Sequence, residues 1–144
     1  MLRTAWHVLG RYGGRDAEDA VQEAFIAALT TDALPRGDVS AWLRAITARK
    51  ALDVVRGARR RAEAQGAEDP PAPSGALSIE TLAVREALVR LQPADRAVLI
   101  LVDLHGHSMA EAAAALGTTN VGARLRAVRA RRKLARILRG GTAP

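Results

Sequence analysis

The part of the chain that most constrains its fold runs from residue 108 to residue 138. Ser108 and Glu111 are spaced as a capping box, in which the serine oxygen accepts a hydrogen bond from a free N–H group in the first turn of a helix. An alanine-rich helix follows, and Gly117 can take the left-handed conformation that ends a helix. Residues 118–120, Thr-Thr-Asn, offer caps for a second helix. The sequence therefore predicts a helix-turn-helix.

The second of these helices is strongly cationic. Residues 121–139 hold eight basic residues and no acidic one, which suits the phosphate backbone of DNA. The alternative is a basic face that is simply solvated. Helical spacing predicts one inward stripe of Ala123, Ala127, Ala130, Leu134 and Ile137.

The composition favours packed helices over sheets. Hydrophobic residues make up 49% of the 144 residues, but much of that share is alanine and only 3% is aromatic. A net charge of +7 and a pI near 11.3 indicate a polyanionic partner rather than a membrane surface. There is no cysteine, no apolar run long enough to span a membrane and no signal peptide. We expect an all-α protein in the cytoplasm.

The first 61 residues predict three helices. A short helix ends near Gly10, and it has the pattern of the tail of a longer helix whose start is missing from this sequence. Asp16 is expected to cap the second helix, and Asp38 or Ser40 a long basic helix over about residues 41–60.

The second helix predicts two contrasting faces. Asp19, Gln22, Glu23 and Ile26 form an acidic, partly apolar face in an otherwise basic protein, which makes it a candidate docking site for a protein. A merely solubilising face is the alternative. The predicted buried face comprises Ala17, Ala20, Val21, Ala24, Phe25, Ala28 and Leu29.

A change of composition divides the chain. Residues 62–76 are rich in Pro, Gly, Ala and acid and lack periodicity, which predicts a flexible linker. We therefore expect two small helical domains, residues 1–61 and 77–139, followed by a tail at 140–144. The second domain predicts four helices, one of them opened by Ala94 or Asp95.

A metal site and an active site are both poorly supported. His105 and His107 have no third ligand close in sequence, so we expect no metal. Asp103 lies near His105, but no nucleophile, phosphate-binding loop or carboxylate pair accompanies it. We expect neither an enzyme nor a cofactor.

Two sets of residues form recognisable motifs. The first is residues 16–25 (DAEDAVQEAF), with Ala41-Trp42-Leu43 further on. The second is residues 91–99 (LQPADRAVL), 106–108, 111–112, 116–117 and 129–134. They resemble region 2 and region 4, respectively, of the extracytoplasmic-function sigma factors of bacterial RNA polymerase. The resemblance implies a two-domain initiation factor that binds core polymerase, promoter duplex and the melted non-template strand, with an anti-sigma factor as a possible further partner.

The resemblance also implies roles for individual residues. Asp19, Gln22, Glu23 and Ile26 would contact polymerase. Arg44, Arg49, Lys50 and Arg56 would bind the downstream promoter element and the open strand. Arg124 and then Asn120 would contact base edges of the upstream element, and Arg126, Arg129 and Arg131 would hold phosphates.

The basic C-terminal helix departs from the family at two core positions. The family usually has apolar core residues where this chain has Ala123 and Ala127. In the expected register Leu125 and Val128 face DNA, where either can contact a thymine methyl group. A shifted register would bury Val121 and Leu125 instead, but would also turn Arg132 inward.

Two other classes of protein stay open at this point. One is a sigma-like regulator that binds DNA without polymerase. The other is a protein that occupies polymerase or an anti-sigma factor without starting transcription.

Overall fold

A computed structural model describes residues 1–12, 15–32, 35, 37–68 and 79–140, and all regular structure within these ranges is helical. The all-α prediction is confirmed. The elements in chain order are α1 (Leu2–Leu9), the short turn η1 (Gly10–Tyr12), α2 (Arg15–Thr30), α3 (Val39–Ala64), α4 (Ile79–Val89), α5 (Pro93–Leu99), the π-helical turn η2 (Ile100–Leu104), α6 (Met109–Leu116) and α7 (Asn120–Leu138).

The predicted helix ends are partly right. α1 ends at Gly10, whose φ of 58° favours glycine, and Asp38 caps α3 by accepting from the Ser40 N–H at 2.9 Å. Asp16 and Asp95 do not cap their helices. Each lies inside the first turn of a helix that begins one or two residues earlier.

The long basic helix extends further than predicted. Residues 61–64 (Arg-Ala-Glu-Ala) are good helix formers, and α3 continues through them to a cap at Gln65. The first part of the predicted linker is therefore helical, and residues 69–76 of it lie outside the described ranges. The division into two domains stays a prediction.

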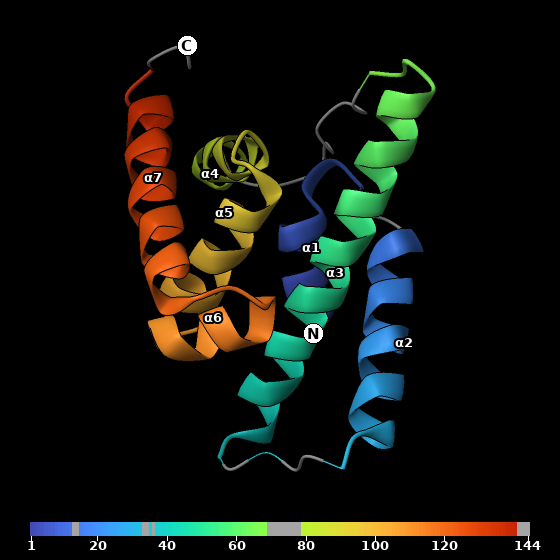
Figure 1. The fold of residues 1–144 in the computed structure, drawn as a ribbon. Coiled ribbons are helices and arrows are strands. Elements are labelled where there is room, and N and C mark those ends of the chain that lie inside the picture. The colour runs from blue at the N-terminus through green and yellow to red at the C-terminus, as the bar shows by residue number, and fades with distance from the viewer. Residues whose placement is uncertain (13–14, 33–34, 36, 69–78, 141–144) are drawn as a thin grey trace.

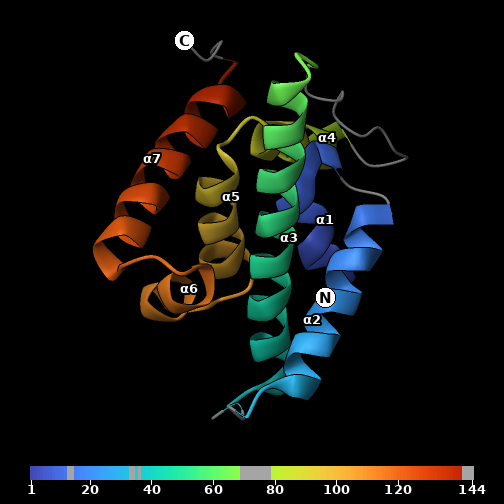
Figure 2. The ribbon, with the colours of Figure 1, turned by 45° about the vertical axis from the view of Figure 1, so that its right-hand side comes forward.

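The N-terminal half, α1–α3, and the C-terminal half, α4–α7, pack against each other. Figures 1 and 2 show α3 running through the middle, with α2 on one side, α5, α6 and α7 on the other, and α1 behind α3. A single cluster of buried side chains draws on both halves, including Val8, Leu52, Val98, Leu101 and Leu116. Most of its other members are alanines, whose small side chains let helices approach closely.

Arg96 joins the two halves from inside the protein. Its side chain is buried, and its Nε donates to the Val8 carbonyl at 2.9 Å. An Nη donates to the carbonyls of Val89 and Leu91 at 3.4 and 3.3 Å. These acceptors lie at the ends of α1 and α4, where carbonyls have no partner within the helix and the dipole favours a cation.

The charge on Arg96 survives its burial. Burial, followed by the nearby charges of Arg59 and Arg11, lowers the pKa of the guanidinium to about 10, so the group is still a cation at neutral pH. Gly10 makes room for it, because a Cβ there would lie 3.1 Å from Arg96 Cζ.

Two histidines also link the halves. Thr4 Oγ1 on α1 lies 2.9 Å from His105 Nε2, just after η2. The ring nitrogens of His107 lie 3.0 Å from the carbonyl oxygens of Leu101 and, across the interface, Ala41. Among the described helices, none is long and apolar enough to cross a membrane.

We predict that His105 makes the folded state sensitive to acid. Burial first, then the charges of Arg44, His107, His7 and the N-terminus, lower its pKa from 6.5 to about 4. Between these values the unfolded chain binds more protons than the folded chain, so the free energy of unfolding falls as the pH falls from 6.5 towards 4. Urea unfolding at pH 7 and pH 5 measures this loss.

His105→Gln is the matched comparison, because protonation of carboxylates affects both proteins alike. The loss between pH 7 and pH 5 should be smaller in the variant than in the parent. An equal loss in both proteins would show that His105 does not carry the effect.

Candidate nucleic-acid and protein interfaces

The helix-turn-helix is built by local hydrogen bonds. Ser108 Oγ accepts from the Glu111 N–H at 3.0 Å and begins α6. Gly117 ends α6 in the left-handed conformation, with φ 68° and ψ 34°. Thr119 Oγ1 then accepts from the Gly122 N–H at 3.0 Å and begins α7. The predicted capping residue of α6 and the glycine turn are confirmed, and Thr119 is the cap chosen from the Thr-Thr-Asn run.

The register of α7 is the one expected. Ala123, Ala127 and Ala130 are buried, and Leu134 and Ile137 are half-buried behind them. Val121, Leu125 and Val128 are 68%, 62% and 45% exposed, so they form an apolar stripe on the outer face of α7. The shifted register is therefore wrong.

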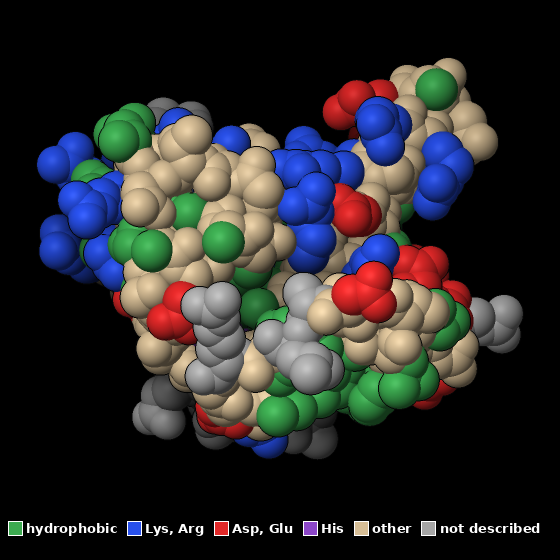
Figure 3. All heavy atoms as spheres, turned by 60° about the horizontal axis from the view of Figure 1, so that its bottom comes forward, with side chains coloured by type: hydrophobic (Ala, Val, Ile, Leu, Met, Phe, Trp, Pro, Cys, Tyr) green, Lys and Arg blue, Asp and Glu red, His purple; other side chains and the backbone are tan. Residues whose placement is uncertain are grey.

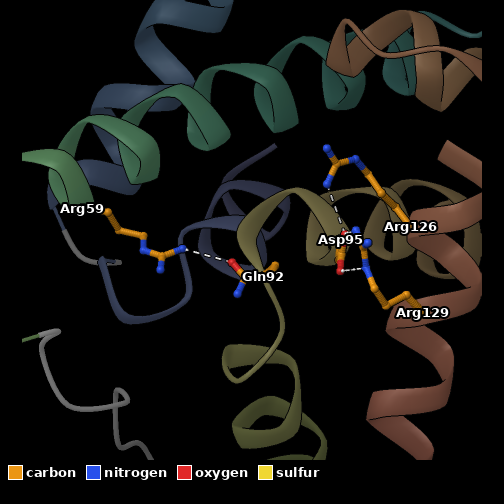
Figure 4. A network of polar contacts seen from close by, with 5 residues as sticks. All are labelled: Arg59, Gln92, Asp95, Arg126 and Arg129. Atoms are coloured by element: carbon orange, nitrogen blue, oxygen red, sulfur yellow. Dashed lines mark hydrogen bonds and ion pairs between the residues drawn. The ribbon is translucent and has the colours of Figure 1, made fainter. Parts of the chain in front are cut away.

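Asp95 binds two of the predicted phosphate ligands. Figure 4 shows its carboxylate between Arg126 and Arg129. Arg129 forms a bidentate pair with it, through Nε at 3.0 Å and Nη2 at 2.9 Å, and Arg126 Nη1 lies 3.3 Å from Oδ1. The carboxylate is buried, and its hydrogen bond and charge raise the pKa of Arg129.

These contacts fasten α5 to α7, a role that sequence reasoning missed. The sequence hinted at this role only through Asp95, the one acidic residue of 91–99, because the basic helix at 120–138 has no acidic residue of its own. Arg131 forms a similar bidentate pair with Asp103, at 2.9 and 2.7 Å, but both side chains of this pair are exposed. Arg124 and Asn120 are exposed, and neither has an ion pair among the described residues.

The basic residues of α3 do not form one surface. Arg49 and Arg56 line a small hollow of about 170 Å³ together with the turn at Gly117 and with Arg126 of α7. Arg49 also forms an ion pair with Asp53 at 3.5 Å. Arg44 lies on another side of α3, near the N-terminal amine and His105; burial first, and then the charge of Arg44, lower the pKa of both groups.

A second hollow separates the start of α3 from α6. This groove has a volume of about 730 Å³ and a mainly apolar lining, which includes Trp42, Ile46, Ala114 and Ala115, with Lys50 at its edge. Its walls come from both halves of the chain.

The four predicted docking residues of α2 share one outer face. Asp19, Gln22 and Glu23 are exposed, and Ile26 is 61% exposed. Phe25 and Leu29, which were expected to be buried, are 47% and 84% exposed, so that part of the prediction is wrong. Phe25 lies at the edge of the buried stripe centred on Ala24, and α2 buries only alanines at its core.

The exposed residues Phe25, Ile26 and Leu29 are neighbours on α2 and form an apolar patch next to the acidic face. Figure 3 shows Lys and Arg side chains along the left edge, where α7 lies, and further groups of them at the centre and upper right. Apolar side chains gather at the lower right, towards α2.

Known proteins match this chain over both halves. The family model for sigma-70 region 2 matches residues 1–61, and that for sigma-70 region 4 matches residues 81–134. The extracytoplasmic-function (ECF) RNA polymerase sigma factor SigM of Mycobacterium tuberculosis is 36% identical over 138 residues, which cover 92% of this chain and 70% of that protein. The chain belongs to the ECF sigma factors.

Other relatives agree with this assignment. The sigma factor CnrH of Cupriavidus metallidurans is 34% identical, over 85% of this chain and 73% of its own length. The sigma factor SigJ of Mycobacterium tuberculosis is 35% identical, over 92% of this chain and 46% of its own. This protein is thus an RNA polymerase sigma factor that functions in transcription initiation.

A solved structure shares the packing of this sigma factor. It is the sigma factor RpoE in complex with the anti-sigma factor NepR from Bartonella quintana, with a TM-score of 0.73 and 25% identity over 96% of this chain and 89% of that one. Because one superposition covers both halves, the way α1–α3 lie against α4–α7 is similar in the two sigma factors.

We predict a strong coupling between Asp95 and Arg129 in this sigma factor. A double-mutant cycle with Asp95→Ala and Arg129→Ala should give a coupling energy of about 1–3 kcal/mol in the free energy of unfolding. The reason is that the Asp95 carboxylate is buried, so leaving it without its arginine partner is costly. Urea unfolding of the parent, the two single variants and the double variant measures it.

Asp103 and Arg131 supply the control pair, with the same bidentate geometry but both side chains exposed. Their coupling should stay below about 1 kcal/mol. Similar coupling energies in the two pairs would contradict the structural role assigned to Asp95.

Proposed function

We propose that this sigma factor binds core RNA polymerase through the outer face of α2 and promoter DNA through α3 and α7. The observation that carries the proposal is the separation of charge. The acidic face of α2 stands on one side of the molecule, and a helix without any acidic residue stands on the other. A protein that must hold an enzyme and its DNA template together needs two such surfaces.

The polymerase contact combines charge with apolar burial. Asp19 and Glu23 supply negative charge, Gln22 supplies hydrogen-bonding groups, and Ile26 belongs to the apolar patch beside them. Covering the patch releases about 25 cal/mol for each Å² of apolar surface removed from water. Charge therefore gives the contact its orientation, while Phe25, Ile26 and Leu29 add affinity.

α7 is proposed to lie in the major groove of the upstream promoter element. The N-terminal part of the second helix of such a motif meets base edges, which are the partners proposed for Arg124 and Asn120. Arg126, Arg129 and Arg131 are proposed to bind phosphates. Asp95 binds Nε and Nη2 of Arg129, and Asp103 binds the same two atoms of Arg131. The Nη1 group of each arginine therefore still has hydrogens to donate to a phosphate.

α3 is proposed to bind the downstream element and the melted non-template strand through Arg44, Arg49, Lys50 and Arg56. In the packed arrangement the turn of the helix-turn-helix lies beside Arg49 and Arg56 and partly covers this face of α3, although Arg56 is exposed and the Arg49 side chain is 43% exposed. We therefore propose that the two halves separate when the sigma factor joins the polymerase, which frees this face of α3 for DNA.

An anti-sigma factor is proposed as the partner of the packed form. The similar packing occurs in RpoE of Bartonella quintana, which is bound there to the anti-sigma factor NepR. The groove between α3 and α6 has walls from both halves, so a helix seated in it would hold the halves together.

None of these steps needs covalent chemistry or a cofactor. Binding energy is used to open a short stretch of duplex, at a cost of about 1.4 kcal/mol for each base-pair step. The proposed partners are chromosomal DNA and its polymerase, so the proposed location is the cytoplasm.

We predict that Asp19→Arg combined with Glu23→Arg abolishes binding to core polymerase. Both residues are exposed, so the variant should keep the circular dichroism and thermal unfolding of the parent. Co-purification with tagged core enzyme measures the loss.

Glu63→Arg combined with Glu68→Arg is the matched control. It makes the same change in net charge at two other exposed positions. The control should bind core enzyme as the parent does. Equal retention of the Asp19/Glu23 variant and the control on core enzyme would refute the polymerase-binding face.

A further inference from the structure

The apolar stripe of α7 has no role in the packing of the chain. Val121, Leu125 and Val128 follow one another at steps of four and three residues, so they line up along one face of the helix. All three are at least 45% exposed. Figures 1 and 2 show α7 at the edge of the molecule, away from α1–α3, so packing of the halves does not cover this face.

Cations lie on both flanks of the stripe and at its C-terminal end. By helical periodicity Arg124 lies on one flank, Arg129 on the other, and Arg132 continues the line towards the C-terminus. Asn120–Leu138 contains no acidic residue. An apolar line between rows of arginine fits a surface that is apolar in its middle and anionic at both edges.

The major groove of DNA is such a surface where it carries thymine. Its two walls are phosphate backbones, and the C5-methyl group of thymine is the apolar group exposed on its floor. Leucine and valine cannot pair with the donors and acceptors of a base edge. Against a G·C pair they would remove these polar groups from water without replacing their hydrogen bonds, which is unfavourable.

We propose that Leu125 and Val128 recognise thymine methyl groups in the upstream promoter element. This inference rests on the proposed function, in which α7 enters the major groove. It adds a specificity that polar recognition helices lack, since the stripe responds to the C5-methyl group itself. A 5-methylcytosine carries the same group at the same place, so it substitutes for thymine at these positions.

The experiment removes the methyl group without changing base pairing. The complete sigma factor, bound to core polymerase, first selects upstream elements from a random duplex library. Each thymine of the selected element is then replaced singly by deoxyuridine. Binding should weaken by about fourfold at one or two positions, which is the value of one buried carbon. At the same positions, 5-methylcytosine should bind more tightly than cytosine.

Leu125→Ala combined with Val128→Ala should bind the thymine and deoxyuridine duplexes equally. Leu138→Ala is the control, because Leu138 is also an exposed leucine on α7 but lies at its far end. This control should keep the fourfold preference. All three positions are exposed, and thermal unfolding checks that the variants stay folded.

The outcomes separate the inference from the function on which it rests. Equal binding of thymine and deoxyuridine by the parent would overturn methyl recognition while promoter binding stands. A preference that persists in the double variant Leu125→Ala, Val128→Ala would also overturn it. Failure of the library to yield any upstream element would overturn the placement of α7 in the groove, and methyl recognition with it.

Discussion

The buried guanidinium of Arg96 is the interaction on which the packing of the two halves depends. A buried cation is costly unless it is hydrogen-bonded, and here its partners are carbonyls at the ends of α1 and α4. These carbonyls belong to helix termini, so they lack intrahelical partners and carry partial negative charge. One side chain thus binds acceptors from both halves, and its loss would remove all of these hydrogen bonds.

The packing held by Arg96 decides which surfaces are available. The outer faces of α2 and α7 point away from the interface, so the proposed polymerase and upstream-element contacts are free in the packed form. The face of α3 that carries Arg49 and Arg56 is turned towards the helix-turn-helix. The packed sigma factor would therefore meet the polymerase and the upstream element before its α3 could hold an open strand.

Local features of the fold could be predicted from the sequence, because their causes lie within a few residues. The Ser108 cap, the Gly117 turn and the alanine stripe of α7 each follow from short-range rules. The outward face of α2 was predicted for the same reason. Phe25 and Leu29 were misassigned because spacing alone does not tell how much of the α2 face the neighbouring helices cover.

Contacts between distant residues could not be predicted in the same way. The pair formed by Asp95 with Arg129 and the reach of Arg96 to Val8 depend on how helices far apart in the sequence are placed. The prolines and acids of residues 62–76 predict a linker, but they do not tell whether the two halves meet. The uses assigned to Arg44, Arg49, Lys50 and Arg56 remain predictions for this reason.

The central physical claim is that Arg96 makes the two halves open together. Native-state hydrogen exchange tests it directly, by comparing amides of α1 with amides of α5 in the parent and in Arg96→Gln. The account predicts one shared opening free energy in the parent, and a lower one in the variant for α1, which loses its link to α5. If α1 and α5 opened independently in the parent, and Arg96→Gln left the exchange of α1 unchanged, the claim would be contradicted.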